Sequence, residues 1–169
     1  MQYDVIIVGA GPAGIFSALE LGETTQLSIL MLDKGPDLDH RKCPASRGLG
    51  CINCDPCPLL SGWGGAGAFS DGKLTLSTEV GGWLNEYMTS KELADLVNYV
   101  DNIYLRFGAP EHFYGTDQEK IEEVERRASF AGLRLVPQKL RHMGTENCAK
   151  VLRKMRQHIS DRVEVQTRK

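Results

Sequence analysis

The sequence lacks an apolar run long enough to cross a membrane, and it lacks an excess of charge of either sign. Its net charge of −2 gives no support to nucleic-acid binding through a basic surface. The N-terminus has no basic segment, and glycine and proline interrupt its apolar run, so it does not resemble a signal peptide. These absences predict a cytoplasmic protein that binds neither membranes nor nucleic acids.

Internal repeats are also lacking. With 41% hydrophobic and 25% charged residues, the composition is that of a globular domain with its own core. Only the C-terminal part is locally basic, and we interpret its charges as the solvated face of a helix in preference to a binding patch. They come from Arg153, Lys154, Arg156, Arg162, Arg168 and Lys169.

Residues 3–34 have the pattern of a β-α-β unit that binds a dinucleotide. The apolar run at 5–8 predicts a strand buried on both faces of a parallel sheet. Gly9, Gly11 and Gly14 follow at G-x-G-x-x-G spacing, which allows a tight turn, close approach of a pyrophosphate, and packing of the next helix on the strand. That helix carries apolar Ile15, Phe16, Ala18, Leu19 and Leu21.

The predicted helix directs its N-terminus at the phosphates, where its partial positive charge and unpaired N–H groups favour an anion. A second apolar run, residues 29–32, ends at Asp33. An acid at this position can accept hydrogen bonds from both ribose hydroxyls. The alternative is a glycine-rich turn without a ligand, but the strand, the helix and the acid around the glycines favour a dinucleotide site.

Residues 36–82 are rich in Gly, Pro and Cys and have little helical or strand periodicity, which points to a functional role for so long a loop. Cys51, Cys54 and Cys57 follow C-x2-C-x2-C spacing, and Cys43 lies a short loop upstream. Such thiolates suit an iron–sulfur cluster or a structural zinc, with thiols that bind no metal as the third interpretation. No fourth cysteine follows at the short ferredoxin spacing, so Cys43 would have to serve. Cys148 is interpreted as a core residue.

A second glycine-rich stretch covers residues 62–74 and allows the backbone to pass close to a ligand. A surface loop of small residues is the alternative, and the neighbouring dinucleotide motif favours the ligand. No catalytic acid or base can be assigned, and Asp71, Lys73 and His142 are candidates only. A solvated position is the default for the first two, and capping or packing for His142.

Sequence patterns in the rest of the chain predict three helices and two strands. Thr89 and Glu92 form a capping box that opens a helix over 89–107, with apolar Leu93, Leu96, Val97, Val100, Ile103, Tyr104 and Phe107 on one face. A second box, Thr116 to Glu119, opens a helix with Ile121, Val124 and Ala128 on its apolar side. A helix capped by Thr145 buries Cys148, Val151, Leu152, Met155 and Ile159. The predicted strands are residues 133–136 and 162–167.

The predicted fold is α/β, a partial Rossmann-like domain with a parallel sheet, an irregular cysteine- and glycine-rich insertion and added helices. Within residues 1–169 we expect a β-α-β motif at 1–35, the loop at 36–82, a mostly helical insertion at 83–160, and a strand at 162–167 that returns to the sheet. Three parallel strands alone would leave large apolar faces bare. We therefore expect an N-terminal fragment of a longer protein.

Together these segments resemble a known family. DVIIVGAGPAG followed by LDKG is similar to the N-terminal FAD-binding motif of glutathione-reductase-like flavoproteins. The cysteine loop, GWGGAGAFSDGKL, and RHMGTENCAKVLRKMR before a final strand resemble the bacterial FAD-dependent, or NAD(FAD)-utilising, dehydrogenases. The resemblance covers most of the chain, and GGAGAFSDGKL is its most specific part.

The resemblance implies FAD, with NAD(P)H as a candidate electron donor, in an oxidoreductase whose small-molecule substrate the sequence does not identify. It implies that strand 162–167 is the third of the FAD domain and that loop 64–73 runs along the pyrophosphate or the flavin. The fragment alone would bind FAD weakly or not at all. The implied cofactor-binding residues are Gly9, Ala10, Gly11, Pro12, Ala13, Gly14, Asp33, Lys34, Gly64, Gly65, Ala66, Gly67, Ser70, Asp71 and Lys73.

Two other classes stay open. One is a nucleotide-binding protein without redox activity, in which FAD would be structural. The other is a metal-binding structural module on a Rossmann-like scaffold. A dehydrogenase that uses NAD alone is disfavoured, because loop 64–73 has no obvious role in one.

Overall fold

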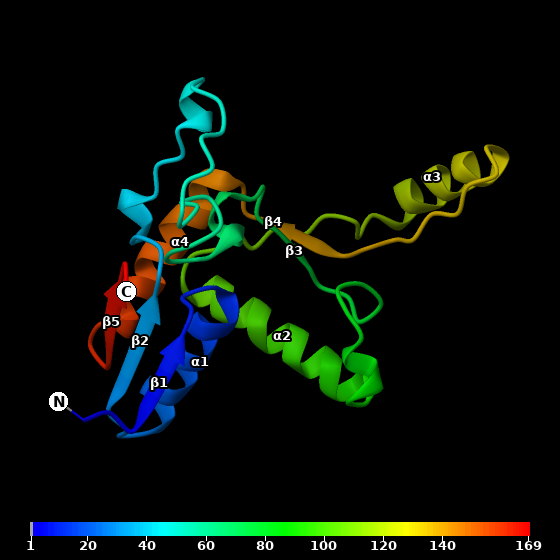
Figure 1. Cartoon of the computed structure of the whole chain (residues 1–169). Coiled ribbons are helices and arrows are strands. Elements are labelled where there is room, and N and C mark those ends of the chain that lie inside the picture. Colours follow the sequence, from blue (N-terminus) through cyan, green and yellow to red (C-terminus); the bar gives the residue numbers. More distant parts are fainter. Residues whose placement is uncertain (1) are drawn as a thin grey trace. The chain divides into compact units, whose positions relative to one another are not determined.

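The computed structural model describes residues 2–169 (Figure 1). These residues form two compact units, the first ending at Gly72 and resuming at Thr145, and the second covering Lys73–Gly144. The predicted helical segment 83–160 therefore contributes to both. Among the described residues, no helix has both the length and the apolar character that a membrane span requires.

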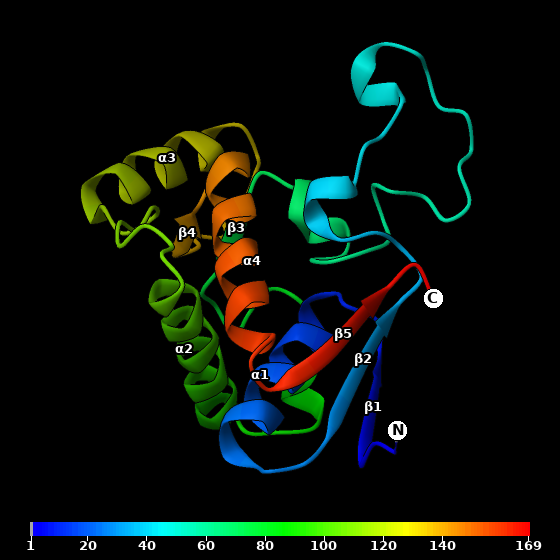
Figure 2. The same ribbon diagram turned by 90° about the vertical axis from the view of Figure 1, so that its left-hand side faces the viewer.

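A three-stranded parallel sheet in the order β1-β2-β5 is the framework of the first unit. It confirms the predicted α/β class, a parallel sheet with a β-α-β motif. Because β2 pairs with β1 on one side and β5 on the other, it is the central strand. Both helices of this unit lie on the same side of the sheet (Figure 2). The elements are β1 (Val5–Val8), α1 (Pro12–Thr24), β2 (Ile29–Asp33), α4 (Thr145–Ile159) and β5 (Val163–Thr167).

The core of the first unit lies between this sheet and its two helices. Strand β2 is the most buried because it has a neighbour on each edge and helices over one face. The predicted inner face of α4 is confirmed at four of its five positions, while Leu152 is only partly buried. Core side chains come from Ile15, Ala18, Leu19, Ile29, Leu30, Met31, Cys148, Val151, Met155, Ile159 and Val163.

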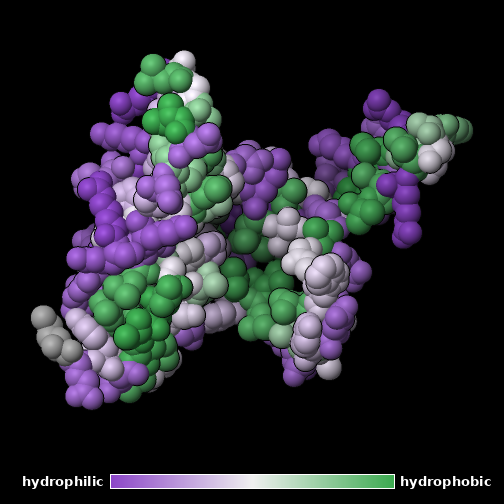
Figure 3. Space-filling view, in the orientation of Figure 1, coloured by the Kyte–Doolittle hydropathy of each residue, from purple (hydrophilic) through white to green (hydrophobic). Residues whose placement is uncertain are grey.

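The prediction that β1 is buried on both faces is wrong for the described chain. Ile6 is 57% exposed and Val8 is 84% exposed, whereas Val5 and Ile7 are partly covered. The reason is that β1 is an edge strand and the helices cover one face only. A hydrophobic patch is visible over β1 and β2 in the space-filling view (Figure 3).

The second unit combines a short antiparallel ladder with two helices. Strand β3 (Lys73–Thr75) pairs with β4 (Leu140–His142), and Lys73 lies opposite His142. The capping box of α2 (Ser90–Arg106) is confirmed, since the Glu92 carboxylate accepts from Thr89 N at 2.8 Å and Thr89 Oγ1 accepts from Glu92 N at 3.3 Å. The buried apolar residues of α2 and its C-terminus are Leu93, Ile103 and Phe107.

Two sequence predictions in this unit are wrong. Helix α3 (Gln118–Phe130) begins after Asp117, whose carboxylate accepts from Lys120 N at 3.3 Å, so Thr116 is not its cap. None of the α3 side chains is buried, because no other described element covers its apolar side. Residues 133–136 form no strand. The strand of this region lies a few residues later, at 140–142, where it pairs with β3.

The predicted loop at 36–82 is largely irregular but not featureless. It contains single turns of 3₁₀ helix, and residues 73–75 within it form β3. The short turns are Leu38–His40, Ala45–Arg47 and Ala66–Phe69, and a fourth, Leu84–Glu86, lies just beyond this loop.

Candidate functional site

The first glycine loop joins β1 to α1 at the carboxyl end of the sheet. Gly9 has φ +102°, a conformation that favours glycine. Its N–H donates to Leu32 O at 2.7 Å, which ties the turn to β2. A Cβ on Gly14 would lie 1.9 Å from Gly9 O, so only glycine lets α1 approach the turn this closely. The predicted roles of these two glycines are therefore visible in the geometry.

Gly11 faces open space where α1 begins. A Cβ added at Gly11 would meet nothing within 4 Å. Gly11 is the N-cap residue, and no side chain of the described residues caps the helix start by a hydrogen bond. Pro12, with no N–H of its own, follows as the first helical residue. Helix N–H groups that no side chain caps, beside open space, suit an anionic ligand.

Asp33 connects the loops that follow β1 and β2. It is 9% exposed, and its two carboxylate oxygens accept from Ala10 N and Gly35 N, each at 2.7 Å. A carboxylate has about four acceptor positions, so two such bonds leave capacity for ribose hydroxyls. The main chain after β5 reaches the same place, since Lys169 N donates to Asp33 O at 3.1 Å. The side chain of Lys34 is exposed.

The second glycine loop lies directly against the first. Gly64 N donates to Ala10 O at 2.8 Å, and a Cβ on Gly65 would lie 3.1 Å from the Gly11 Cα. The sequence predicted a ligand role for each loop, and the fold brings the two loops together. Ala66, Gly67, Ser70 and Asp71 continue from this contact along the exposed surface of the first unit. The remaining candidates, Lys73 and His142, pair across β3 and β4 in the second unit.

Arg41 is a site residue that sequence reasoning missed. It is 5% exposed, and its guanidinium donates to four main-chain carbonyls at 2.7–2.9 Å. It also lies 4.6 Å from the centre of the Phe69 ring. Burial lowers the pKa of Arg41, and attraction to Asp33 and Cys57 opposes that shift. The carbonyls belong to Pro58, Leu59, Trp63 and Gly65, so one cation joins the end of the cysteine loop to the second glycine loop.

All four cysteines of the predicted metal site line one cavity of about 240 Å³. Cys51 is exposed, and the other three are partly exposed. Within residues 2–169, no group of three or more His, Cys, Asp or Glu side chains is arranged to hold a metal ion. The thiols thus surround a common space without converging on one point. The cysteines involved are Cys43, Cys51, Cys54 and Cys57.

The fifth cysteine, Cys148, gives a testable contrast in reactivity. Burial raises the pKa of the Cys148 thiol, and the nearby negative charge of Asp71 adds to the shift. Because the thiolate is the reactive form, Cys148 should stay unmodified in the folded, metal-free protein while exposed Cys51 is alkylated. Iodoacetamide labelling near pH 7.5, followed by peptide mass spectrometry, measures both rates. In denaturant the two rates should become equal, and equal rates in the native protein would contradict the buried position.

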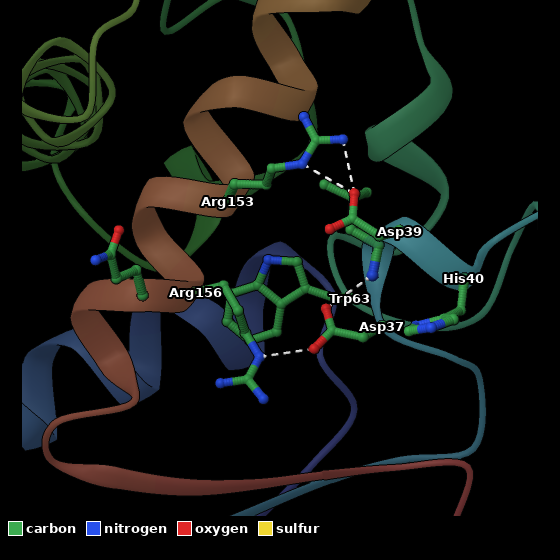
Figure 4. Close-up of a pocket in the computed structure, with 8 residues that line it drawn as sticks. Asp37, Asp39, His40, Trp63, Arg153 and Arg156 are labelled. Carbon is green, nitrogen blue, oxygen red and sulfur yellow. Dashed lines mark hydrogen bonds and ion pairs between the residues drawn. The ribbon is translucent and has the colours of Figure 1, made fainter.

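A further cavity of about 340 Å³ lies between α4 and the turn at residues 38–40 (Figure 4). Arg153 bonds to Asp39 at 2.7 Å and Arg156 to Asp37 at 3.1 Å, so each arginine is matched by an aspartate. Fully buried Trp63 forms a wall and donates its indole N–H to Leu152 O at 2.9 Å. These contacts attach the start of the second glycine loop to α4. They also give two of the predicted basic residues a structural role.

Comparisons with known proteins give short or distant similarities. No family model matches the chain. Over 72 residues it is 43% identical to an uncharacterized protein of Clostridium beijerinckii, a match that covers 41% of this chain and 13% of that protein. Among solved structures, the L-amino acid deaminase of Proteus myxofaciens in complex with anthranilate aligns with 15% identity and a TM-score of 0.43. That alignment covers 99% of this chain and 38% of the deaminase.

Proposed function

We propose that this chain is the FAD-binding portion of a flavoprotein oxidoreductase. The observation that carries the proposal is the open, uncapped start of α1 at Gly11, with Asp33 at the neighbouring strand end. A pyrophosphate would accept from the N–H groups of the first helical turn, and Asp33 would accept from the adenosine ribose. This position is the carboxyl edge of a parallel sheet, where α/β proteins bind nucleotides.

The second glycine loop favours FAD over NAD. Its contact with Ala10 and Gly11 adds a second stretch of backbone beside the pyrophosphate position. A longer dinucleotide with a bulky flavin ring would use this additional backbone. The bound isoalloxazine would supply the redox chemistry, and the chain's residues would hold and orient it. NAD(P)H is the proposed electron donor, and the substrate is a small molecule of unspecified class.

Gly11→Ala should weaken FAD binding at least tenfold, about 1.4 kcal/mol, because the new methyl group would enter the space that the pyrophosphate needs. Titration of the intact protein with FAD, followed by flavin fluorescence, measures the dissociation constant. Thr24→Ala, at the exposed far end of α1, is the matched control and should leave it unchanged. If the unaltered protein binds no FAD, or if Gly11→Ala binds it normally, the proposed site is wrong.

Anaerobic addition of NADH or NADPH to the FAD-loaded protein then separates two functions. Bleaching of the flavin absorption would support an oxidoreductase. A flavin that stays oxidised with both donors would instead favour a nucleotide-binding protein in which FAD is structural.

A further inference from the structure

We propose that Cys43, Cys51, Cys54 and Cys57 bind an iron–sulfur cluster. This site is separate from the proposed FAD site and adds a second redox-active group to the same unit. The observation that carries it is the single cavity of about 240 Å³ that these four cysteines line. Four thiolates are the usual protein ligands of [2Fe–2S] and [4Fe–4S] clusters.

The size of the cavity favours a cluster over a single zinc ion. Zinc holds its sulfur ligands at about 2.3 Å, so four thiolates around it enclose almost no free space. Here the four thiols, together with five neighbouring residues, line a larger volume. An inorganic core of several iron and sulfide ions would fill the space between them.

The cysteine segment is free to close around such a core. Among residues 2–169, no main-chain to main-chain hydrogen bond involves residues 50–56. The two ends of the segment are anchored, because Cys43 O accepts from Ser46 N at 3.2 Å and Cys57 O accepts from Ser61 N at 2.9 Å. Small main-chain movements between these anchors would bring Cys51 and Cys54 toward the other two thiols.

The charges near the cavity favour an anionic cluster. Four thiolates give such a cluster a net negative charge, which nearby basic side chains would offset. A neighbouring cavity shares Cys43 and Pro58 with the cysteine cavity and is lined by three basic side chains. One of them, buried Arg41, donates its hydrogen bonds to four neutral main-chain carbonyls. The basic residues are Arg41, Lys42 and Arg47.

Metal analysis of the intact protein, purified without oxygen, tests the proposal. We expect iron and acid-labile sulfide in equal amounts, about two to four of each per chain. Cys54→Ala should lower both at least tenfold, whereas Cys148→Ala, which removes a buried thiol outside the cavity, should leave both unchanged. Zinc without sulfide, or no metal even after reconstitution with ferrous iron and sulfide, would overturn the proposal.

A measurement on the unaltered protein avoids the risk that a variant misfolds. Native alkylation should spare all four cavity cysteines while the cluster is present and modify them after ferricyanide and EDTA remove it. Modification of any of the four at full rate in the iron-loaded protein would rule out its role as a ligand. Flavin content is determined separately on each sample, so loss of the cluster and loss of the FAD site are distinguished.

Discussion

Replacing Gly14 with alanine should destabilise the first unit by about 3 kcal/mol or more, although alanine is the better helix former. The added Cβ would lie 1.9 Å from the main-chain oxygen of Gly9 and 3.3 Å from a methyl carbon of Ile7. A main-chain oxygen in a tight turn cannot move aside as the end of a flexible side chain can. Helix α1 would have to shift away from β1 and lose part of the core it forms with the sheet.

Thermal unfolding followed by circular dichroism measures this loss, and about 3 kcal/mol corresponds to a fall of roughly 6–12 °C in Tm. Gly11→Ala is the control, since its Cβ meets nothing within 4 Å and its φ of −78° is open to any residue. Gly11→Ala should therefore unfold like the unaltered protein while it binds FAD at least tenfold more weakly, and Gly14→Ala should lose both stability and FAD affinity. Equal stability of the two variants would contradict the close packing of α1 on the turn.

The second large effect is expected in the other unit, at a buried ion pair. Arg141 is 1% exposed, and its Nε and Nη2 donate to the two carboxylate oxygens of Asp101 at 2.6 and 2.7 Å. It also donates to Pro110 O and lies 4.4 Å from the centre of the Phe113 ring. Asp101→Ala would leave this buried guanidinium without the carboxylate that it hydrogen-bonds, at a cost of about 3–5 kcal/mol.

Denaturant unfolding of Asp101→Ala measures this cost. Hydrogen exchange shows where stability is lost, and we expect the amides of α2 and β4 to lose protection. The double variant Asp101→Leu with Arg141→Met should recover most of the stability, because apolar residues of similar volume often replace a buried pair at little cost. Lys120→Ala breaks the exposed Lys120–Asp117 pair and should cause no measurable change. If Asp101→Ala were as stable as the unaltered protein, the Asp101–Arg141 ion pair would not contribute to the free energy of unfolding as expected.

Local patterns were sufficient to predict the β-α-β unit. Glycine spacing, a short apolar run and a terminal acid each restrict the backbone within a few residues, so β1, α1 and β2 follow from the sequence directly. The capping box at Thr89 and the inner face of α4 are local in the same sense. These predictions succeeded because their physical causes act over one or two helical turns.

The failures arose where the outcome depended on a distant partner. An apolar run such as residues 5–8 predicts a buried strand, but the neighbours in the sheet decide which of its faces is covered. Residues 133–136 have a suitable composition for a strand, but no strand among residues 2–169 pairs with them. At α3, Asp117 and Thr116 are both residue types that cap helices, and in the structure Asp117 is the N-cap, with its carboxylate bonded to Lys120 N.

By itself, the sequence determined the glycine turn, the acid at Asp33 and the grouping of cysteines within one short loop. Only the tertiary structure placed the second glycine loop on the first. It also made Arg41 a common hydrogen-bond donor to the end of the cysteine loop and to the start of the second glycine loop. The physical reason is that main-chain carbonyls carry no sequence signature. A buried cation satisfied by them can be recognised only after the fold has brought them together.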